Sequence, residues 1–216
     1  FTNPLDDAIR GCAGLDSSSY TKLDEVPYDF GRRMLSVLLS GGGETVMITK
    51  GALANVLSVC TKAELPSGET ADLESLRSDI EKRYKDLSSQ GLRTIGVAYR
   101  TGIGGGRIDK SDESGMIFLG FVALYDPPKE DVSETIAELG RLGISLKVVT
   151  GDNRGVARFI GERVGMREPE VVTGGEIAGL TGDSLRAVAA RCDIFAEIEP
   201  AQKERIVLAL KKAGNV

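Results

Sequence analysis

The chain has 216 residues, 27 of them basic and 32 acidic, and its formal net charge is −5. Hydrophobic residues make up 41% and charged residues 27% of it, an ordinary composition for a soluble globular protein of one large or two modest domains. The two signs of charge are spread evenly along the chain, so a basic face is not expected and nucleic acid is not a predicted partner.

Several residue types are scarce or missing. The chain has no histidine, which excludes histidine general bases, histidine-ligated metals and Ser-His-Asp triads. Its three cysteines, Cys12, Cys60 and Cys192, are far apart, so neither a disulfide framework nor a zinc site is expected and a reducing compartment fits. No apolar run approaches the ~18 residues of a membrane helix, so direct membrane insertion is not predicted. The ends, at Phe1 and Val216, read as cuts in a longer protein.

The first part of the chain has the pattern of an α+β domain. Residues 3–14 open with a well-capped helix start. Strands are predicted at residues 23–28, 34–39, 45–49, 92–99 and 116–125, and helices at 53–59 and from 73 to about 90. The glycines at 41–43 indicate a hairpin, and the apolar strand 116–125 is expected to be largely buried. Residues 62–70 are predicted to be a polar connection, and residues 102–115 a mobile hairpin connection.

From Asp126 onward the hydrophobic period changes. Helices are predicted at residues 129–142, 153–164, 184–191 and 200–213, and strands at 144–149, 171–172 and 194–196. Strands that alternate with helices of this length indicate βαβ units and a parallel sheet. We therefore place a domain boundary at about Asp126, which gives domains of residues 1–125 and 126–216.

Polar residues follow the predicted strands of the second part. Asp126, Thr150, Gly151 and Asp152 stand at strand ends, and Lys203 lies in the turn before the last helix. Ligands of open parallel sheets bind beyond the carboxyl ends of the strands, and a threonine hydroxyl, helix-start N–H groups and a lysine suit a phosphate. The two aspartates suit a hydrated Mg²⁺ or the backbone of a hinge. Each of these turns is equally typical of a plain helix cap, and Lys203 alone of a solvated residue.

Taken together these motifs resemble a known family. Asp126-Pro127-Pro128-Lys129, Thr150-Gly151-Asp152-Asn153 and Pro200-x-x-Lys203, at these separations, look like the phosphorylation domain of P-type cation-transporting ATPases, which has the haloacid-dehalogenase-like fold. Lys50-Gly51-Ala52 resembles the nucleotide motif of that family, and Gly91-Leu92-Arg93 the segment whose arginine contacts nucleotide phosphates. The resemblance covers essentially the whole chain.

Further segments match the same family and narrow the branch. Phe30 followed by Arg32-Arg33 resembles the segment that stacks on adenine, and Asp6 falls where the family carries an acidic residue near adenine. The stretches around Asp6 and Phe30 look most like the magnesium-transporting branch found in microbes. An exposed phenylalanine offers a stacking face, and arginines pair with phosphates, although a core phenylalanine and surface ion pairs are the common alternatives.

The resemblance implies a fold and a set of roles. The fold is α/β: an α+β nucleotide-binding domain with an antiparallel sheet at residues 1–125, its N-terminal part missing, then part of a haloacid-dehalogenase-like, Rossmann-like parallel-sheet domain at 126–216. The implied catalytic residues are Thr150, Gly151, Asp152 and Lys203. The implied nucleotide-binding residues are Asp6, Phe30, Arg33, Lys50, Gly51, Arg93 and Asp126, and no metal ligands are expected within the chain.

The implied activity is ATP hydrolysis through an aspartyl phosphate, with ATP and Mg²⁺, coupled to transport of a cation, Mg²⁺ by resemblance. The chain would be a cytoplasmic portion of an integral plasma (inner) membrane protein, whose transmembrane and actuator domains are its partners. Domain closure about Asp126-Pro127-Pro128 would deliver the γ-phosphate. The family's Asp-Lys-Thr-Gly-Thr stretch, which carries the phosphorylated aspartate, is not in this sequence, so the chain alone is expected to be inactive. Two alternatives stay open: a soluble haloacid-dehalogenase-like phosphatase with a cap domain, and a non-catalytic nucleotide-binding module.

Overall fold

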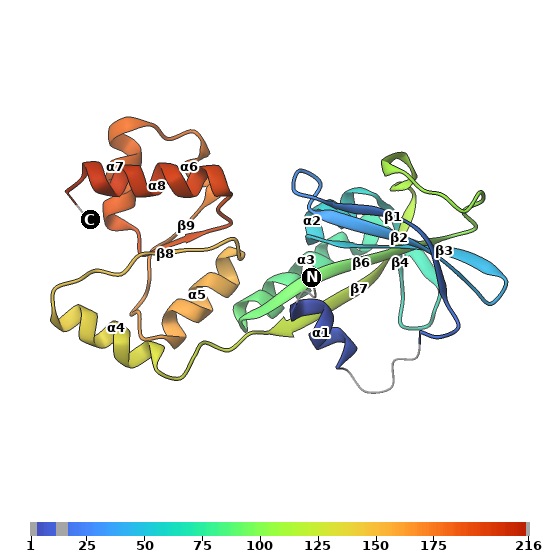
Figure 1. Ribbon diagram of the computed structural model, residues 1–216, viewed down its shortest axis with the longest axis horizontal. Coiled ribbons are helices and arrows are strands. Elements are labelled where there is room, and N and C mark those ends of the chain that lie inside the picture. Colours follow the sequence, from blue (N-terminus) through green and yellow to red (C-terminus); the bar gives the residue numbers. More distant parts are fainter. Residues whose placement is uncertain (1–3, 12–16, 215–216) are drawn as a thin grey trace. The chain divides into compact units, whose positions relative to one another are not determined.

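A computed structural model describes residues 4–11 and 17–214 of the protein. Contacts divide the chain into two units, drawn in Figure 1. The first comprises Phe1–Arg83 with Thr94–Leu124, and the second Tyr84–Arg93 with Tyr125–Val216. The predicted division at Asp126 into two functional domains stays a prediction. Among the described residues, no helix has both the length and the apolar character needed to cross a membrane.

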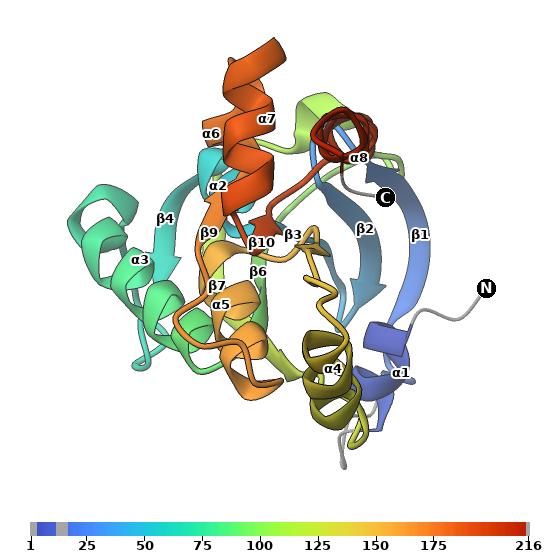
Figure 2. The ribbon, with the colours of Figure 1, turned by 90° about the vertical axis from the view of Figure 1, so that its left-hand side faces the viewer.

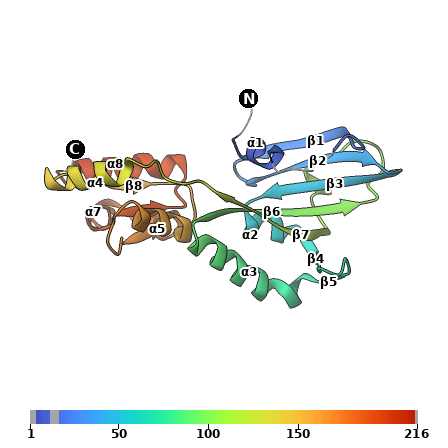
Figure 3. The same cartoon turned by 90° about the horizontal axis from the view of Figure 1, so that it is seen from below.

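The first unit is built on a seven-stranded sheet in the order β1-β2-β3-β6-β7-β4-β5, whose first four strands lie side by side in Figure 3. The strands are β1 (Thr21–Asp29), β2 (Met34–Gly41), β3 (Glu44–Gly51), β4 (Cys60–Glu64), β5 (Thr70–Asp72), β6 (Leu92–Thr101) and β7 (Met116–Tyr125). The pairs β1–β2, β2–β3, β3–β6 and β4–β5 are antiparallel, whereas β4 runs parallel to β7. The sheet is therefore mostly antiparallel, as predicted, with the parallel β4–β7 pair as the exception.

The β2–β3 hairpin follows directly from its sequence. In β2 every second residue, beginning with Met34, Ser36 and Leu38, is buried, as expected for a strand with one face on the core. Gly42 and Gly43 form the turn with φ of 62° and 84°, and two such residues suit the tight turn that matches the twist of a hairpin. The predicted hairpin is confirmed.

Within the described residues, the α-helices found before residue 125 are α1 (Pro4–Arg10), α2 (Leu53–Ser58) and α3 (Leu73–Ser89), and they occur where they were predicted. Two other predictions were wrong. Residues 62–70, predicted to be a polar connection, contribute to β4 and β5, whose short polar sequences lack an apolar alternation. Strand β7 is buried at Met116 and Phe118, but Leu119 and Tyr125 are half exposed, so the strand is covered only in part.

The connection between β6 and β7 was predicted to be mobile, but side chains tether it at several points. Ile103 and Ile108 are buried, and the Thr45 hydroxyl donates a hydrogen bond to the Ile103 carbonyl at 2.7 Å. The connection also contains a short 3₁₀ turn, η1 (Lys110–Asp112), closed by reciprocal hydrogen bonds between Asp109 and Asp112. A glycine-rich composition concealed these anchors.

The second unit contains a three-stranded sheet in the order β8-β10-β9, and both pairings are parallel as predicted. The strands are β8 (Val148–Val149), β9 (Val171–Thr173) and β10 (Ile194–Ala196), so the first is shorter than the predicted 144–149. The helices are α4 (Val132–Arg141), α5 (Arg154–Arg163), α6 (Gly174–Ala178), α7 (Gly182–Arg191) and α8 (Pro200–Lys212). Helix α6 was not predicted because it has only five residues.

Strand β10 is the centre of this unit, and helices cover both of its faces. Phe195 belongs to a buried cluster with residues of α6, α7 and α8, whereas Ile194 and Ala196 belong to a cluster with Ala157 of α5. Neighbouring residues of a strand point to opposite faces, so α5 lies on one side of the sheet and α6 to α8 on the other (Figures 1 and 2). This layering brings the carboxyl ends of three parallel strands to one edge.

Candidate functional site

Phe30 stands at the tip of the turn between β1 and β2, and its side chain is 83% exposed. Tyr28 supports it from one edge, with ring centroids 5.4 Å apart and planes at 89°. A large apolar ring at this exposure gains nothing from the core, and its face is available to a flat, apolar ligand. The alternative that Phe30 is a core residue is therefore wrong.

Arg33 and the Lys50-Gly51-Ala52 segment lie next to each other. Arg33 is exposed and adopts the left-handed conformation, with φ of 51°. Its carbonyl accepts a hydrogen bond from the Ala52 N–H at 3.0 Å, and Lys50 pairs with Leu35 in the β2–β3 register. The sequence had indicated that Lys50 lies in a strand-to-helix turn. In the structure it is half-buried and lies within β3, near the end of that strand. Arg33 and Lys50, the two cationic residues predicted for this site, thus lie beside the hydrogen bond between the Ala52 N–H and the Arg33 carbonyl.

Gly51 is the point of closest approach in this contact. A Cβ built at Gly51 would lie 2.4 Å from the Arg33 carbonyl oxygen and 2.5 Å from the Met34 Cβ. No side chain fits in that space, so the glycine lets the Arg33–Met34 backbone pack against β3. The structure thereby gives the glycine of this motif a packing role in addition to its predicted nucleotide role.

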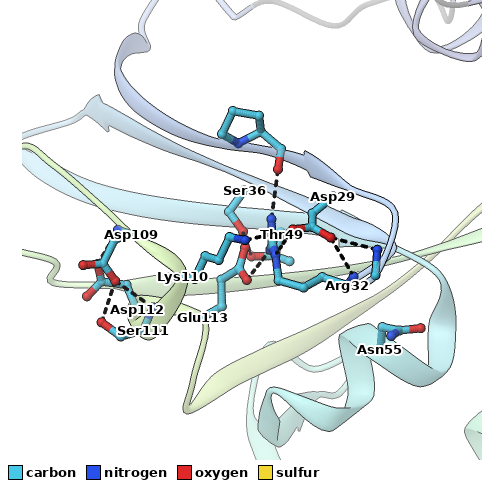
Figure 4. Close-up of polar contacts among 12 residues, drawn as sticks. Asp29, Arg32, Ser36, Thr49, Asn55, Asp109, Lys110, Ser111, Asp112 and Glu113 are labelled. Carbon is cyan, nitrogen blue, oxygen red and sulfur yellow. Dashed lines mark hydrogen bonds and ion pairs between the residues drawn. The ribbon is translucent and has the colours of Figure 1, made fainter.

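Sequence reasoning missed the residues that hold the Phe30 turn (Figure 4). Asp29 Oδ1 accepts the N–H groups of Gly31 and Arg32 at 2.8 and 3.2 Å, and its other oxygen lies 2.8 Å from Lys110 Nζ. The hydrogen bond from Lys110, followed by those from the two N–H groups, lowers the pKa of Asp29 to about 2. Arg32 in turn pairs with the buried Glu113. The hint of these contacts in the sequence was an acidic residue, Glu113, inside a glycine-rich connection.

In the second unit, the Thr150 turn is closed on itself. The Thr150 hydroxyl donates to Asp152 Oδ2 at 3.0 Å and accepts the Asp152 N–H at 3.1 Å. The segment after β10 fixes the turn from the side, because the Ile198 N–H donates to the Thr150 carbonyl and the Glu197 N–H to the Asp152 carbonyl. Glu197 has φ of 57°, an unusual conformation for this residue type that often accompanies functional sites.

Asn153 completes this turn as the N-cap of α5. Its side-chain oxygen accepts the Val156 N–H at 3.0 Å, and its amide nitrogen donates to Tyr84 Oη and Ser88 Oγ at 3.0 and 3.1 Å. Capping satisfies one of the free N–H groups at the helix start. The cap alternative therefore holds for Asn153, while Thr150 and Gly151 precede the helix and take no part in that cap.

Arg93, Asp126 and Asp152 form one cluster. Arg93 Nη2 lies 2.7 Å from Asp152 Oδ1, and Nη1 lies 3.5 Å from Asp126 Oδ2. The guanidinium neutralises both carboxylates, which therefore do not form a ready site for Mg²⁺, a cation that requires oxygen ligands around it. Among the residues that the structure describes, no group of three or more acidic or cysteine side chains is placed to hold a metal ion. The predicted ion-pair alternative for Arg93 is confirmed.

Two further predicted residues complete the set. Lys203 lies in the first turn of α8, is exposed, and makes no ion pair with any residue in the described ranges. Asp6 falls within α1, but its side chain lies outside the described part of the chain.

Comparisons with known proteins agree on one family. The family model described as "P-type ATPase, cytoplasmic domain N" matches residues 9–131. The chain is 38% identical over 203 residues to magnesium-transporting ATPases, P-type 1, of Salmonella typhimurium and of Escherichia coli K12, which covers 93% of the chain and 22% of each relative. It is 28% identical over 201 residues to calcium-transporting ATPase 1 of Bacillus cereus. The chain thus spans about a fifth of the length of these relatives, at 22%.

Proposed function

Since the chain belongs to the P-type ATPase family and its sequence supports the magnesium-transporting branch, we propose that its first unit binds ATP at the β1–β2 turn. The observation that carries this proposal is the Phe30 ring, which is 83% exposed at the end of a turn that is itself firmly held. Adenine stacks on this face. Arg33 and Lys50 supply positive charge for the phosphates, and Asp6 is the acidic residue proposed to serve the adenine.

The second unit is proposed to be part of a haloacid-dehalogenase-like phosphorylation domain. The Thr150 hydroxyl, the Gly151 backbone and the Lys203 ammonium hold the phosphoryl group that is being transferred. Phosphoryl transfer depends mainly on positioning and on stabilising charge, which are the properties that a fixed hydroxyl and a cation provide. Arg93 lies 2.7 Å from Asp152 of this turn, and it reaches the phosphates by exchanging a carboxylate partner for one of them.

In the whole protein the phosphoryl group is proposed to pass to an aspartate in an Asp-Lys-Thr-Gly-Thr stretch, which the 216-residue sequence does not contain. Mg²⁺ is proposed to enter as part of the Mg·ATP substrate. Hydrolysis drives transport of a cation, Mg²⁺ by likeness to the named relatives, through transmembrane and actuator domains of the same polypeptide. The chain is accordingly a cytoplasmic portion of an inner-membrane protein, and by itself takes up no labelled phosphate from ATP.

The proposal is tested by replacing the stacking ring. Base–aromatic stacking is worth about 1–3 kcal/mol, so Phe30→Ala should weaken ATP binding about 5- to 150-fold. Affinity is measured by calorimetry with Mg·ATP. Because the ring is almost fully exposed, the same substitution should leave the thermal midpoint of unfolding nearly unchanged.

A matched control is Tyr20→Ala. Tyr20 is also an exposed aromatic residue of the first unit, at 49%, but it lies before β1 and away from the turn. The Tyr20→Ala variant should bind ATP with the same affinity as the unaltered chain. Equal affinities for the Phe30→Ala, Tyr20→Ala and unaltered chains would show that adenine does not stack on Phe30.

A further inference from the structure

A carboxylate is buried beneath the turn that carries Phe30. The side chain of Glu113, from the β6–β7 connection, is only 2% exposed. Ser36 Oγ donates to its Oε1 at 2.7 Å, and Arg32 Nη1 donates to its Oε2. The proton of Ser36 is thereby used, so Ser36 accepts from the Thr49 hydroxyl, 2.7 Å away. Buried glutamates are rare unless paired, so this group has a definite structural purpose.

Arg32 transmits the position of Glu113 to the turn. Its Nη2 donates to the Pro27 carbonyl of β1 at 2.9 Å while Nη1 is held by Glu113. The guanidinium therefore ties Pro27 of strand β1, before the turn, to Glu113 of the β6–β7 connection, which lies 81 residues after Arg32 in the sequence. Figure 4 shows Arg32, Asp29 and Lys110 converging on the same turn.

Phe30 has little else to fix it. Its ring contacts Tyr28 at one edge and is otherwise exposed, so its position depends on the backbone of the turn. Fixing a binding surface in advance reduces the loss of conformational freedom on binding. A buried ion pair, by contrast, contributes little net stability, because the cost of burying the charges offsets their attraction. Stability alone does not explain why the chain buries the Arg32–Glu113 pair. Preorganisation of the Phe30 turn does explain it.

We propose that Glu113, acting through Arg32, is a positioning residue that holds the Phe30 ring ready to receive adenine. This inference rests on the proposed nucleotide site at Phe30. It adds a residue that touches neither the nucleotide nor Phe30 and is 83 positions away from the ring in the numbering of the chain.

Two variants test the proposal. Glu113→Gln keeps the shape and removes the charge. Its one amide oxygen can still accept from Arg32, while its NH₂ group faces Ser36 as a donor. Arg32→Met with Glu113→Gln removes both charges, so no unpaired charge stays buried and the fold is retained. Each variant should bind Mg·ATP about 2- to 13-fold more weakly, the range expected when one side chain must be ordered on binding. Glu74→Gln, which breaks the exposed Glu74–Arg77 pair of the same unit, is the control and should not change affinity.

A spectroscopic readout separates positioning from general loss of structure. All six phenylalanines are replaced by 4-fluorophenylalanine, and the ¹⁹F resonance of Phe30 is assigned by its disappearance in Phe30→Leu. In both Glu113 variants this resonance should move toward the position of the free amino acid. The resonance of the buried Phe118 should stay in place, since it reports the core of the same unit.

The outcomes are distinct. A shifted Phe30 resonance with weaker ATP binding supports the proposal. An unmoved resonance overturns it, whether or not affinity falls. If the unaltered chain does not bind ATP, or Phe30→Ala has no effect on binding, the nucleotide site itself is wrong. The resonance then still decides whether Glu113 positions the ring.

Discussion

Gly51→Ala is the sharpest test of the packing between β2 and β3. The new Cβ would lie 2.4 Å from the Arg33 carbonyl oxygen, 2.5 Å from the Met34 Cβ and 2.7 Å from the Met34 Cα. Two of these three atoms belong to the backbone, so a change of rotamer does not relieve the contact. The strands must separate by about 1 Å to restore ordinary van der Waals distances of about 3.5 Å.

The cost has two parts. Overpacking a tight site costs about 1–3 kcal/mol, and separation of the strands strains the hydrogen bond from Ala52 N–H to the Arg33 carbonyl, a further ~0.5–1.5 kcal/mol. We expect a total of about 2–4 kcal/mol. Since the chain has two units and need not unfold in one step, hydrogen exchange of peptides from β2 and β3 is the appropriate assay. Their protection should fall about 30- to 900-fold.

Gly104→Ala is the matched control, because no atom lies within 4 Å of its built Cβ and its φ is not in the left-handed region. It should alter protection by less than about 0.5 kcal/mol. Equal protection in Gly51→Ala and Gly104→Ala would refute the packing argument. If ATP affinity fell in Gly51→Ala without loss of protection, the glycine would be needed for the nucleotide alone.

Three further predictions concern other sites. Asn153→Ala should destabilise α5 by about 1–3 kcal/mol through loss of its cap and of two hydroxyl partners, whereas Asn153→Asp, which can accept from all three groups, should cost less than half as much by hydrogen exchange. Because the pKa of Asp29 is lowered, its contacts stabilise the fold fully above about pH 4, and this stabilisation is lost as the pH falls toward 2. A ¹³C titration of the Asp29 carboxyl group should show a midpoint near 2, and the midpoint should rise toward its ordinary value in Lys110→Met. An unmoved midpoint in that variant would exclude the ion pair. Burial raises the pKa of the Cys60 thiol to about 12 and also raises the pKa of the Cys192 thiol. A thiol reagent at about pH 8 should therefore modify at most one of the three cysteines in the folded chain, and all three in urea. Rapid labelling of two cysteines in the folded chain would contradict this prediction.

The regular elements could be predicted because local pattern determined them. The apolar run of β2, the glycine turn after it and the amphipathic spacing of α3 are each visible in the sequence itself. Residues 62–70 and helix α6 lacked such signals, since their segments are short and polar or only five residues long. Burial of β7 was overestimated because an apolar run does not reveal how much of a strand its neighbours cover.

The candidate site divided in the same way. Motifs placed Phe30 and Thr150 at turns, and the structure has them there, whereas Lys203, predicted in the turn before the last helix, lies within the first turn of α8. The close approach of the Arg33 carbonyl to Gly51 depends on the β2–β3 register, in which Met34 pairs with Gly51. The pairing of Arg32 with Glu113 depends on a contact across 81 positions, and a local sequence pattern predicts neither contact. Glycines and serines around Glu113 indicated a loose connection, but buried Ile103, Ile108 and Glu113 hold it in place. The family match to an N domain argues against the phosphatase alternative.

The assignment of residues 84–93 to the second unit has a consequence for synthesis of the protein. Ser88 is made early, but its partner Asn153 follows 65 residues later. At ~5–20 residues per second the ribosome needs about 3–13 s to supply that partner. During this interval the last turns of α3 have no amide to bind, while the chain on either side belongs to the first unit. The first unit is thus finished around a segment still waiting for its own core, and slow codons between positions 125 and 153 would lengthen the period in which that segment is open to chaperones and proteases.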